Sequence, residues 1–176
     1  MDFVPFDDST HPDLMRYQND IQYAAAQAKI PSCFLATIVW RETGGQNIFQ
    51  TGKSRGPGCG VGLAQITSDV IWDNSEDPTY GKYRLMVPSD NLYVAANYFI
   101  VSDLRNAQLA QINDSKAFNQ SCRGQLAFAA ACAYNAGWHA VELALTGGTD
   151  ADITTTHGYG ADVLSKYIEL CNNSHK

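Results

Sequence analysis

Glu42 places a carboxylate on the apolar face of a hydrophobic segment, at the carboxyl end of that segment. The spacing of Leu35, Ile38 and Glu42 predicts a helix over Pro31 to Thr43 whose buried stripe includes the acid. Two glycines follow as a C-cap would, so partial desolvation and the negative end of the helix dipole are both expected to raise the pKa of Glu42. A carboxylic acid that keeps its proton near neutral pH is what a general acid in glycosidic bond cleavage requires. The alternative is a solvated glutamate at a fraying helix end.

Three further motifs follow Arg41-Glu42-Thr43. They are the segment Gly60 to Ile66 (GVGLAQI), the segment Ala133 to Gly137 (AYNAG), and Tyr159 at the start of an amphipathic stretch. In this order the four motifs resemble the signature of the goose-type lysozyme and lytic transglycosylase family, which cleaves peptidoglycan. The resemblance extends from about Ile21 to Leu170. One short glycine-rich motif is a weak signal, but four in the right order form a strong one.

The resemblance implies a role for each matched residue. Glu42 would protonate the glycosidic oxygen between N-acetylmuramic acid and N-acetylglucosamine, then act as base toward the muramic acid C6 hydroxyl, which gives a 1,6-anhydro product. Tyr159 resembles the tyrosine whose hydroxyl orients the catalytic acid. Gln65 would hydrogen-bond substrate or hold its loop, and Asn135 would contact an N-acetyl or hydroxyl group. The other substrate-binding candidates are Thr43, Ser54, Ile66 and Tyr134.

Structural roles are the alternative for several of these residues. Tyr134 and Tyr159 are of a type that often packs in cores, and Gln65 and Asn135 are of types that often brace loops or cap helices.

The sequence departs from the family pattern at positions that bear on the reaction. Thr43 stands where the family has Ser, which keeps a hydroxyl, and Ala64 stands where it has Met, which changes the floor of the cleft. No Asp or Glu lies between Glu42 and Gln65, and Asp69 is the nearest acid beyond. An inverting hydrolase requires a second carboxylate about 6.5–9.5 Å from the first to activate water. Transglycosylation by a single Glu is therefore favoured over hydrolysis, with a hydrolytic lysozyme as the alternative.

Two other classes are weighed against this one. A catalytically silent peptidoglycan-binding module would keep the fold, but the presence of Glu42 with Gln65 and Tyr159 argues against it. An amidase or peptidase would need a nucleophile or a metal centre. The four histidines do not have zincin spacing, and no Ser or Cys has a recognisable nucleophile context, so neither metal nor cofactor is expected.

Composition indicates one ordinary globular domain over residues 1–176, with an apolar fraction of 45% and no membrane-length segment. The net charge of −6 argues against a nucleic-acid partner. The resemblance implies a protein, expected to be a monomer, that binds peptidoglycan glycan strands and acts on the bacterial cell wall, in the periplasm or outside the cell. The first residues do not form a signal peptide. With the resemblance, this leads to the expectation of a phage lysin or a virion-associated enzyme.

The five cysteines show no metal-binding spacing. Cys122 and Cys132 fall in one predicted helix, too far apart to bridge, whereas Cys33 and Cys59 have the potential to pair across the loop after Glu42. Because the number is odd and no signal peptide is visible, five reduced and mostly buried thiols are the preferred expectation.

The periodicity predicts a mainly α fold with at most a small β-hairpin. The resemblance implies that the helices form a lysozyme-like bundle around a substrate cleft. Gln46 to Gly60 and Asp73 to Pro88 are predicted as loops, the first with the hairpin near it. Besides the helix that carries Glu42, the predicted helices are one from Thr10 or Asp13 to near Lys29, a short one from Thr67 or Ser68 to Trp72, one capped by Ser89 over Asp90 to about Leu109, a central one over Cys122 to Ala136, and two at Trp138 to Leu145 and Gly160 to Cys171.

Overall fold

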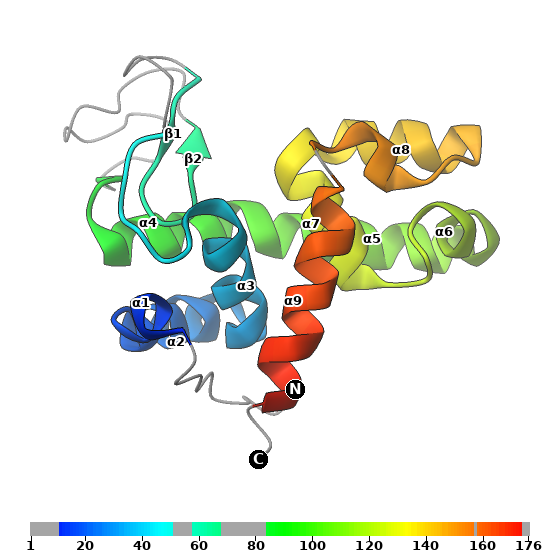
Figure 1. Ribbon diagram of the computed structural model, residues 1–176. Coiled ribbons are helices and arrows are strands. Elements are labelled where there is room, and N and C mark those ends of the chain that lie inside the picture. The colour runs from blue at the N-terminus through cyan, green and yellow to red at the C-terminus, as the bar shows by residue number, and fades with distance from the viewer. Residues whose placement is uncertain (1–10, 51–57, 68–83, 157, 174–176) are drawn as a thin grey trace. The chain divides into compact units, whose positions relative to one another are not determined.

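The computed structural model describes residues 11–50, 58–67, 84–156 and 158–173. Over these residues the chain is mainly α-helical, with a small two-stranded antiparallel hairpin (Figure 1), which confirms the predicted class at this level. The chain divides into two compact units. The first comprises Met1–Tyr98 with Leu170–Lys176, the second comprises Phe99–Glu169, and each is described by itself.

The amino-terminal part of the first unit holds two helices, α1 (Pro12–Met15) and α2 (Gln18–Ala28). The prediction of one continuous helix is wrong, because the chain turns at Arg16 and Tyr17 between them. The predicted end is confirmed: Lys29 takes a left-handed conformation with φ 57° and closes α2. Helix α2 packs against both α3 and α4, and α1 packs against α3.

Helix α3 (Ser32–Thr43) agrees with its prediction at both ends. Pro31 is the N-cap residue, and Gly44 ends the helix in the left-handed region with φ 64°. The residues from Ser32 to Val39 are all buried, so α3 is the central helix of this unit. Such burial follows from its composition, since Cys33 to Trp40 contains hardly any polar side chain.

The hairpin follows the predicted loop and is formed by β1 (Gly60–Val61) and β2 (Ile66–Thr67). Gly60 pairs with Thr67 and Val61 with Ile66, and Phe49 adds an isolated antiparallel bridge to Val61. Thr67 therefore ends a strand, so the prediction that a short helix starts at Thr67 is wrong. The other start, Ser68, and the rest of that predicted helix lie outside the described residues.

A long helical stretch comprises α4 (Pro88–Val94), the π-helical segment η1 (Ala95–Ile100) and α5 (Val101–Asn113). The predicted cap at Ser89 is wrong. Pro88 already occupies the first turn, where a residue without an N–H is well tolerated, and Val87 is the cap residue. The boundary between the two units falls within η1.

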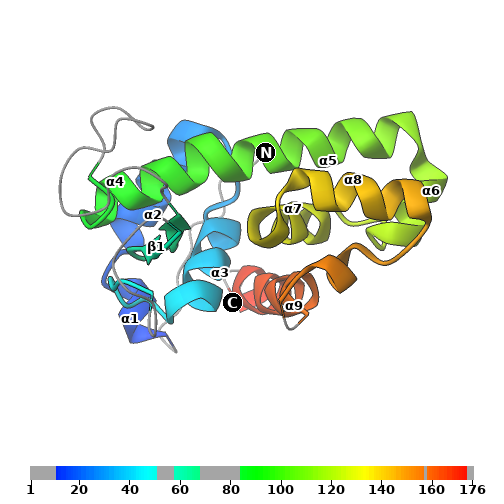
Figure 2. The ribbon, with the colours of Figure 1, turned by 90° about the horizontal axis from the view of Figure 1, so that it is seen from above.

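The second unit is built around α7 (Leu126–Ala136), which packs against both α5 and α8 (Trp138–Gly147) (Figure 2). Helix α6 (Ser115–Ser121), not predicted from the sequence, packs on α5 and α8. A 3-10 turn, η2 (Ala151–Thr154), precedes α9 (Tyr159–Asn173), whose last residues belong to the first unit. The core of the second unit includes Ala107, Phe118, Phe128, Ala129, Cys132, Val141 and Ala144.

The predicted central helix is four residues too long at its amino end. Cys122 lies after α6 as its C-cap residue, and Arg123 and Gly124 take positive φ values of 55° and 67°. Two successive left-handed residues interrupt a right-handed helix. Helix α7 therefore begins only at Leu126, and Cys122 and Cys132 do not share a helix.

A disulfide joins Cys33, near the start of α3, to Cys171, near the end of α9, with Cα atoms 5.7 Å apart. The expectation of five reduced thiols is therefore wrong, and so is a Cys33–Cys59 pair. Cys59, Cys122 and Cys132 are free and buried. Both partners of the disulfide belong to the first unit, although 138 positions separate them in the chain.

Candidate active-site residues

Glu42 lies in the last turn of α3 and is half-buried, as its spacing from Leu35 and Ile38 predicts. Those two residues are fully buried one and two turns earlier on the same face. The left-handed Gly44 ends the helix directly after Thr43, so the acid is held at the carboxyl terminus of the helix dipole. This is the position that the general-acid hypothesis requires.

Thr43 links this helix end to the hairpin. Its Oγ1 lies 2.9 Å from the carbonyl oxygen of Leu63 and 3.2 Å from that of Val39, and the single hydroxyl proton is shared between these two acceptors. The contact to Leu63 fixes the residue next to Glu42 to the turn between β1 and β2. The Thr43 hydroxyl is thus used in contacts within the protein.

Gln65 braces the same turn. Its Nε2 donates to the carbonyl oxygens of Gly62 at 2.8 Å and Ile48 at 3.0 Å, and its backbone has a φ of 49°. Of the two roles predicted for Gln65, holding the loop is the one that these contacts perform. Ile66 follows in β2 with its side chain buried.

Asn91 on α4 is a further determinant of the turn, and sequence analysis missed it. The residue is fully buried, and its Nδ2 donates to the carbonyl oxygens of Val61 at 2.8 Å and Leu85 at 3.0 Å. Its Oδ1 accepts from the N–H of Ala64 at 2.9 Å. Every hydrogen-bonding atom of the amide is therefore used to hold the turn. The signal in the sequence was a polar residue beside Leu92, on the inward side of a predicted helix.

The second unit contains two further candidates from the sequence, Tyr134 and Asn135. Tyr134 is half-buried in the last turn of α7, and its ring meets that of Phe99 edge-on with centroids 6.3 Å apart. Asn135 is exposed, and its Oδ1 accepts from the backbone N–H of Thr156 at 2.9 Å and from Thr156 Oγ1 at 3.3 Å. Asn135 therefore connects the end of α7 to the segment that leads into α9.

Tyr159 is the first residue of α9, as the motif predicts, and only 2% of it is exposed. Its backbone N–H donates to Thr155 Oγ1 at 3.1 Å. A Cβ on the next residue, Gly160, would clash with Sγ of Cys132 and lie 3.1 Å from the Phe128 ring. The start of α9 therefore lies close against α7, which requires glycine at this position.

Asp103 on α5 is a buried carboxyl group that sequence analysis did not single out. Burial raises its pKa from the ordinary 3.8 to about 7. Among the contacts of the residues described, none is a hydrogen bond or ion pair to Asp103. The group is thus protonated through the acidic range and ionises near neutral pH.

The free thiols of the second unit are unsuited to nucleophilic catalysis. Burial, aided by the charge of Asp150, raises the pKa of Cys122 to about 11. Burial, with Asp152 as the next cause, also raises the pKa of Cys132 well above its usual range. A thiol is a weak nucleophile while it keeps its proton.

The structure thus distributes the candidates over both units. Glu42, Thr43, Gln65 and Ile66 come together around the end of α3 and the hairpin. Tyr134, Asn135 and Tyr159 come together around the end of α7 and the start of α9. Ser54 lies outside the described residues, as does Asp69.

Comparison with known proteins does not assign the chain to a family, because no family model and no curated protein sequence matches it. Across the described residues, no group of three or more His, Cys, Asp or Glu is arranged to hold a metal ion. No helix among those residues is long and apolar enough to cross a membrane.

Proposed function

We propose that the protein cleaves the β-1,4 glycosidic bond between N-acetylmuramic acid and N-acetylglucosamine in bacterial peptidoglycan. Glu42 acts as the general acid and then as the base, within a lysozyme-like α-helical fold. The observation that carries this proposal is a half-buried Glu at the carboxyl end of a buried helix, next to a Thr43 that is bonded to a braced hairpin turn. The order of the four motifs along the chain supports the same chemistry.

The favoured reaction is lytic transglycosylation. From Glu42 to Gln65 the sequence contains no second carboxylate that would activate water. The C6 hydroxyl of the muramic acid is then the available nucleophile, and its attack is intramolecular, which gives it a high effective concentration. Glu42, having delivered its proton to the leaving oxygen, accepts the proton of that hydroxyl. The products are a 1,6-anhydromuramic acid end and a free N-acetylglucosamine end.

The other residues serve this reaction by placement. Gln65 and Thr43 keep the turn beside Glu42 in one conformation, through the contacts to Gly62, Ile48 and Leu63. Asn135 and Tyr134 are the proposed glycan contacts of the second unit. The proposed contribution of the Tyr159 hydroxyl is to turnover rather than to affinity.

We also propose that the protein works as a monomer at the cell wall, in the periplasm or outside the cell, as a phage lysin or virion-associated enzyme would. The Cys33–Cys171 disulfide supports a place of action outside the reducing cytosol, because disulfides persist mainly in oxidising compartments.

Mass spectrometry of the muropeptides released from purified peptidoglycan tests the proposal. Anhydro ends are expected, one water lighter than the corresponding reducing ends. Reducing ends alone would make the enzyme a hydrolytic lysozyme, with Asp69 as the first candidate for the second carboxylate. Intact glycan strands after binding would indicate a catalytically silent peptidoglycan-binding module.

A further inference from the structure

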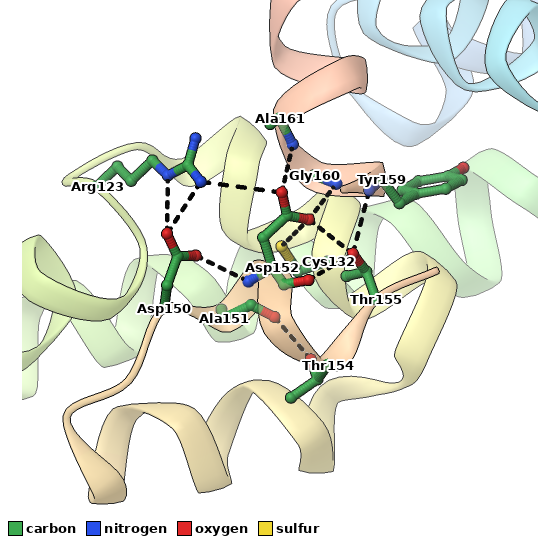
Figure 3. Close-up of polar contacts among 10 residues, drawn as sticks. All are labelled: Arg123, Cys132, Asp150, Ala151, Asp152, Thr154, Thr155, Tyr159, Gly160 and Ala161. Atoms are coloured by element: carbon green, nitrogen blue, oxygen red, sulfur yellow. Dashed lines mark hydrogen bonds and ion pairs between the residues drawn. The ribbon is translucent and has the colours of Figure 1, made fainter. Parts of the chain in front are cut away.

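The amino end of α9 is capped by two side chains that lie outside the helix. Asp152 Oδ1 accepts from the N–H of Gly160 at 2.7 Å, and Oδ2 accepts from the N–H of Ala161 at 3.2 Å (Figure 3). Thr155 Oγ1 accepts from the N–H of Tyr159 at 3.1 Å and donates toward Asp152 Oδ1 at 2.7 Å. We call these two residues the Asp152–Thr155 cap. It satisfies the first three N–H groups of a helix, which the helix cannot bond itself.

The cap is itself held in place by neighbouring charges. Asp150 Oδ1 accepts from the backbone N–H of Asp152 at 2.9 Å, and Asp150 Oδ2 pairs with Arg123 at 2.9 Å (Figure 3). A guanidinium nitrogen of Arg123 also lies 3.9 Å from Asp152 Oδ2. The guanidinium carbon of Arg123 lies 4.3 Å from the centroid of the Phe128 ring. The Asp152 carboxylate, whose side chain is 9% exposed, is thus compensated by a cation and by the positive end of the helix dipole.

Packing restricts the same turn from the other side. Because Gly160 lies against Cys132 and Phe128 of α7, the backbone at this point has no room to shift toward α7. The cap prevents the opposite movement, since a shift would break the three bonds to Tyr159, Gly160 and Ala161. The backbone at Tyr159 is therefore held on one side by the Asp152–Thr155 cap and on the other by the packing of Gly160 against α7.

We propose that Asp152 and Thr155 are positioning residues for Tyr159 in the cleavage reaction. The inference rests on the proposed function, in which the Tyr159 hydroxyl contributes to turnover. A catalytic group that is misplaced by about 1 Å can cost on the order of 100-fold in rate, so an anchored helix start has a direct kinetic consequence. The cap acts on turnover through Tyr159 and leaves glycan affinity unchanged.

Thr155→Val and Asp152→Asn test this inference, and Thr154→Val is the matched control. Thr154 and Thr155 are neighbours near the same turn, and the hydroxyl oxygen of each lies close to a carbonyl oxygen three residues earlier, at 2.6 and 2.8 Å. Thr155 alone of the two also bonds Asp152 Oδ1 and the N–H of Tyr159. We expect kcat on peptidoglycan to fall roughly tenfold or more in both cap variants, with KM within about twofold and the control close to the parent.

A double-mutant cycle with Tyr159→Phe separates positioning from simple loss of stability. If the cap acts through the Tyr159 hydroxyl, Thr155→Val lowers kcat in the parent but has little further effect once that hydroxyl is gone. Equal losses in both backgrounds would overturn the inference, and so would unchanged kcat in the cap variants. Faster hydrogen exchange at Tyr159 to Ala161 in folded Thr155→Val, but not in Thr154→Val, is also expected, and unchanged exchange would contradict the cap.

The same experiment distinguishes the inference from the function on which it rests. A folded parent protein that leaves peptidoglycan intact overturns both. An active parent with additive losses in the cycle overturns the positioning role alone.

Discussion

Asp103→Asn should remove a pH dependence of stability that the buried carboxyl group imposes on the second unit. In the folded protein burial raises the pKa of Asp103 to about 7, against an ordinary value of 3.8. The unfolded chain therefore releases this proton at lower pH than the folded protein does. The stability that the protonated group contributes is complete below about pH 3.8 and is lost as the pH rises through 7.

The magnitude follows from the two pKa values. At about 1.36 kcal/mol per pKa unit, the change from 3.8 to about 7 corresponds to about 4 kcal/mol of unfolding free energy lost by pH 8. Asparagine has nearly the same shape and does not ionise. The variant should match the parent within about 1 kcal/mol near pH 4 and exceed it increasingly toward pH 8.

Urea unfolding at a series of pH values between 4 and 8.5, followed by circular dichroism, measures this difference. Glu169→Gln is the matched control, because Glu169 is an exposed carboxylate of the same unit. The control should keep the parent's pH dependence. A free-energy difference between Asp103→Asn and the parent that stays constant over this range would refute the role of Asp103.

Three further predictions concern the supports of the candidate site. Replacing both Cys33 and Cys171 with Ala should lower the free energy of unfolding by up to about 5 kcal/mol, because the disulfide closes a loop of 138 positions. Dithiothreitol should destabilise the parent by a similar amount and leave the variant unchanged. A parent that is insensitive to the reductant would contradict the disulfide. Asn91→Asp should lower the free energy of unfolding in urea by about 3 kcal/mol, because two buried carbonyl oxygens lose their donor. Asn97→Asp, which loses one half-buried bond to Tyr93, should lower it clearly less. Equal losses would refute the role of Asn91. Tyr159→Phe should lower kcat on peptidoglycan and leave KM nearly unchanged, with the exposed Tyr23→Phe as control, and an unaltered kcat would leave Tyr159 a core residue.

The helix that carries Glu42 could be predicted because its signals are local. Pro31 and Gly44 mark its two ends. The eight residues from Ser32 to Val39 are nearly all apolar or small, which is typical of a helix buried in a core. The start of α9 at Tyr159 agrees with the motif, whereas the residue pattern places the start one position later, at Gly160.

Other features depend on contacts that spacing does not reveal. The Cys33–Cys171 bond joins residues at opposite ends of the chain, so neither the count nor the spacing of cysteines indicates it. The alanine-rich stretch after Gln125 favours a helix, but that helix begins only beyond Arg123 and Gly124, whose left-handed backbone separates α6 from α7. Local capping rules also fail for Asp152, which lies seven residues before α9 begins.

In the candidate site, too, some residues are marked by local sequence motifs and others depend on contacts between distant parts of the chain. Glu42 and Gln65 are predicted from the motifs, and the structure places Glu42 in the last turn of α3 and Gln65 in the turn between β1 and β2. Asn91 was missed, because its function depends on Val61 and Ala64 of the hairpin, which lie 30 and 27 residues away in the sequence, as well as on the nearer Leu85. The local sign of this network is a polar residue on a buried helix face, because buried polar groups are almost always hydrogen-bonded.

The central claim is that Glu42 delivers the proton that breaks the glycosidic bond. Digestion of purified peptidoglycan by the parent and by Glu42→Gln, with the released muropeptides measured by mass spectrometry, tests it most directly. The amide is nearly isosteric but cannot deliver a proton, so release should fall by about 10²–10⁴-fold while the fold is retained. Glu169→Gln, which removes an exposed carboxylate, should release muropeptides at the parent's rate. Release by Glu42→Gln within a few-fold of the parent would contradict the account.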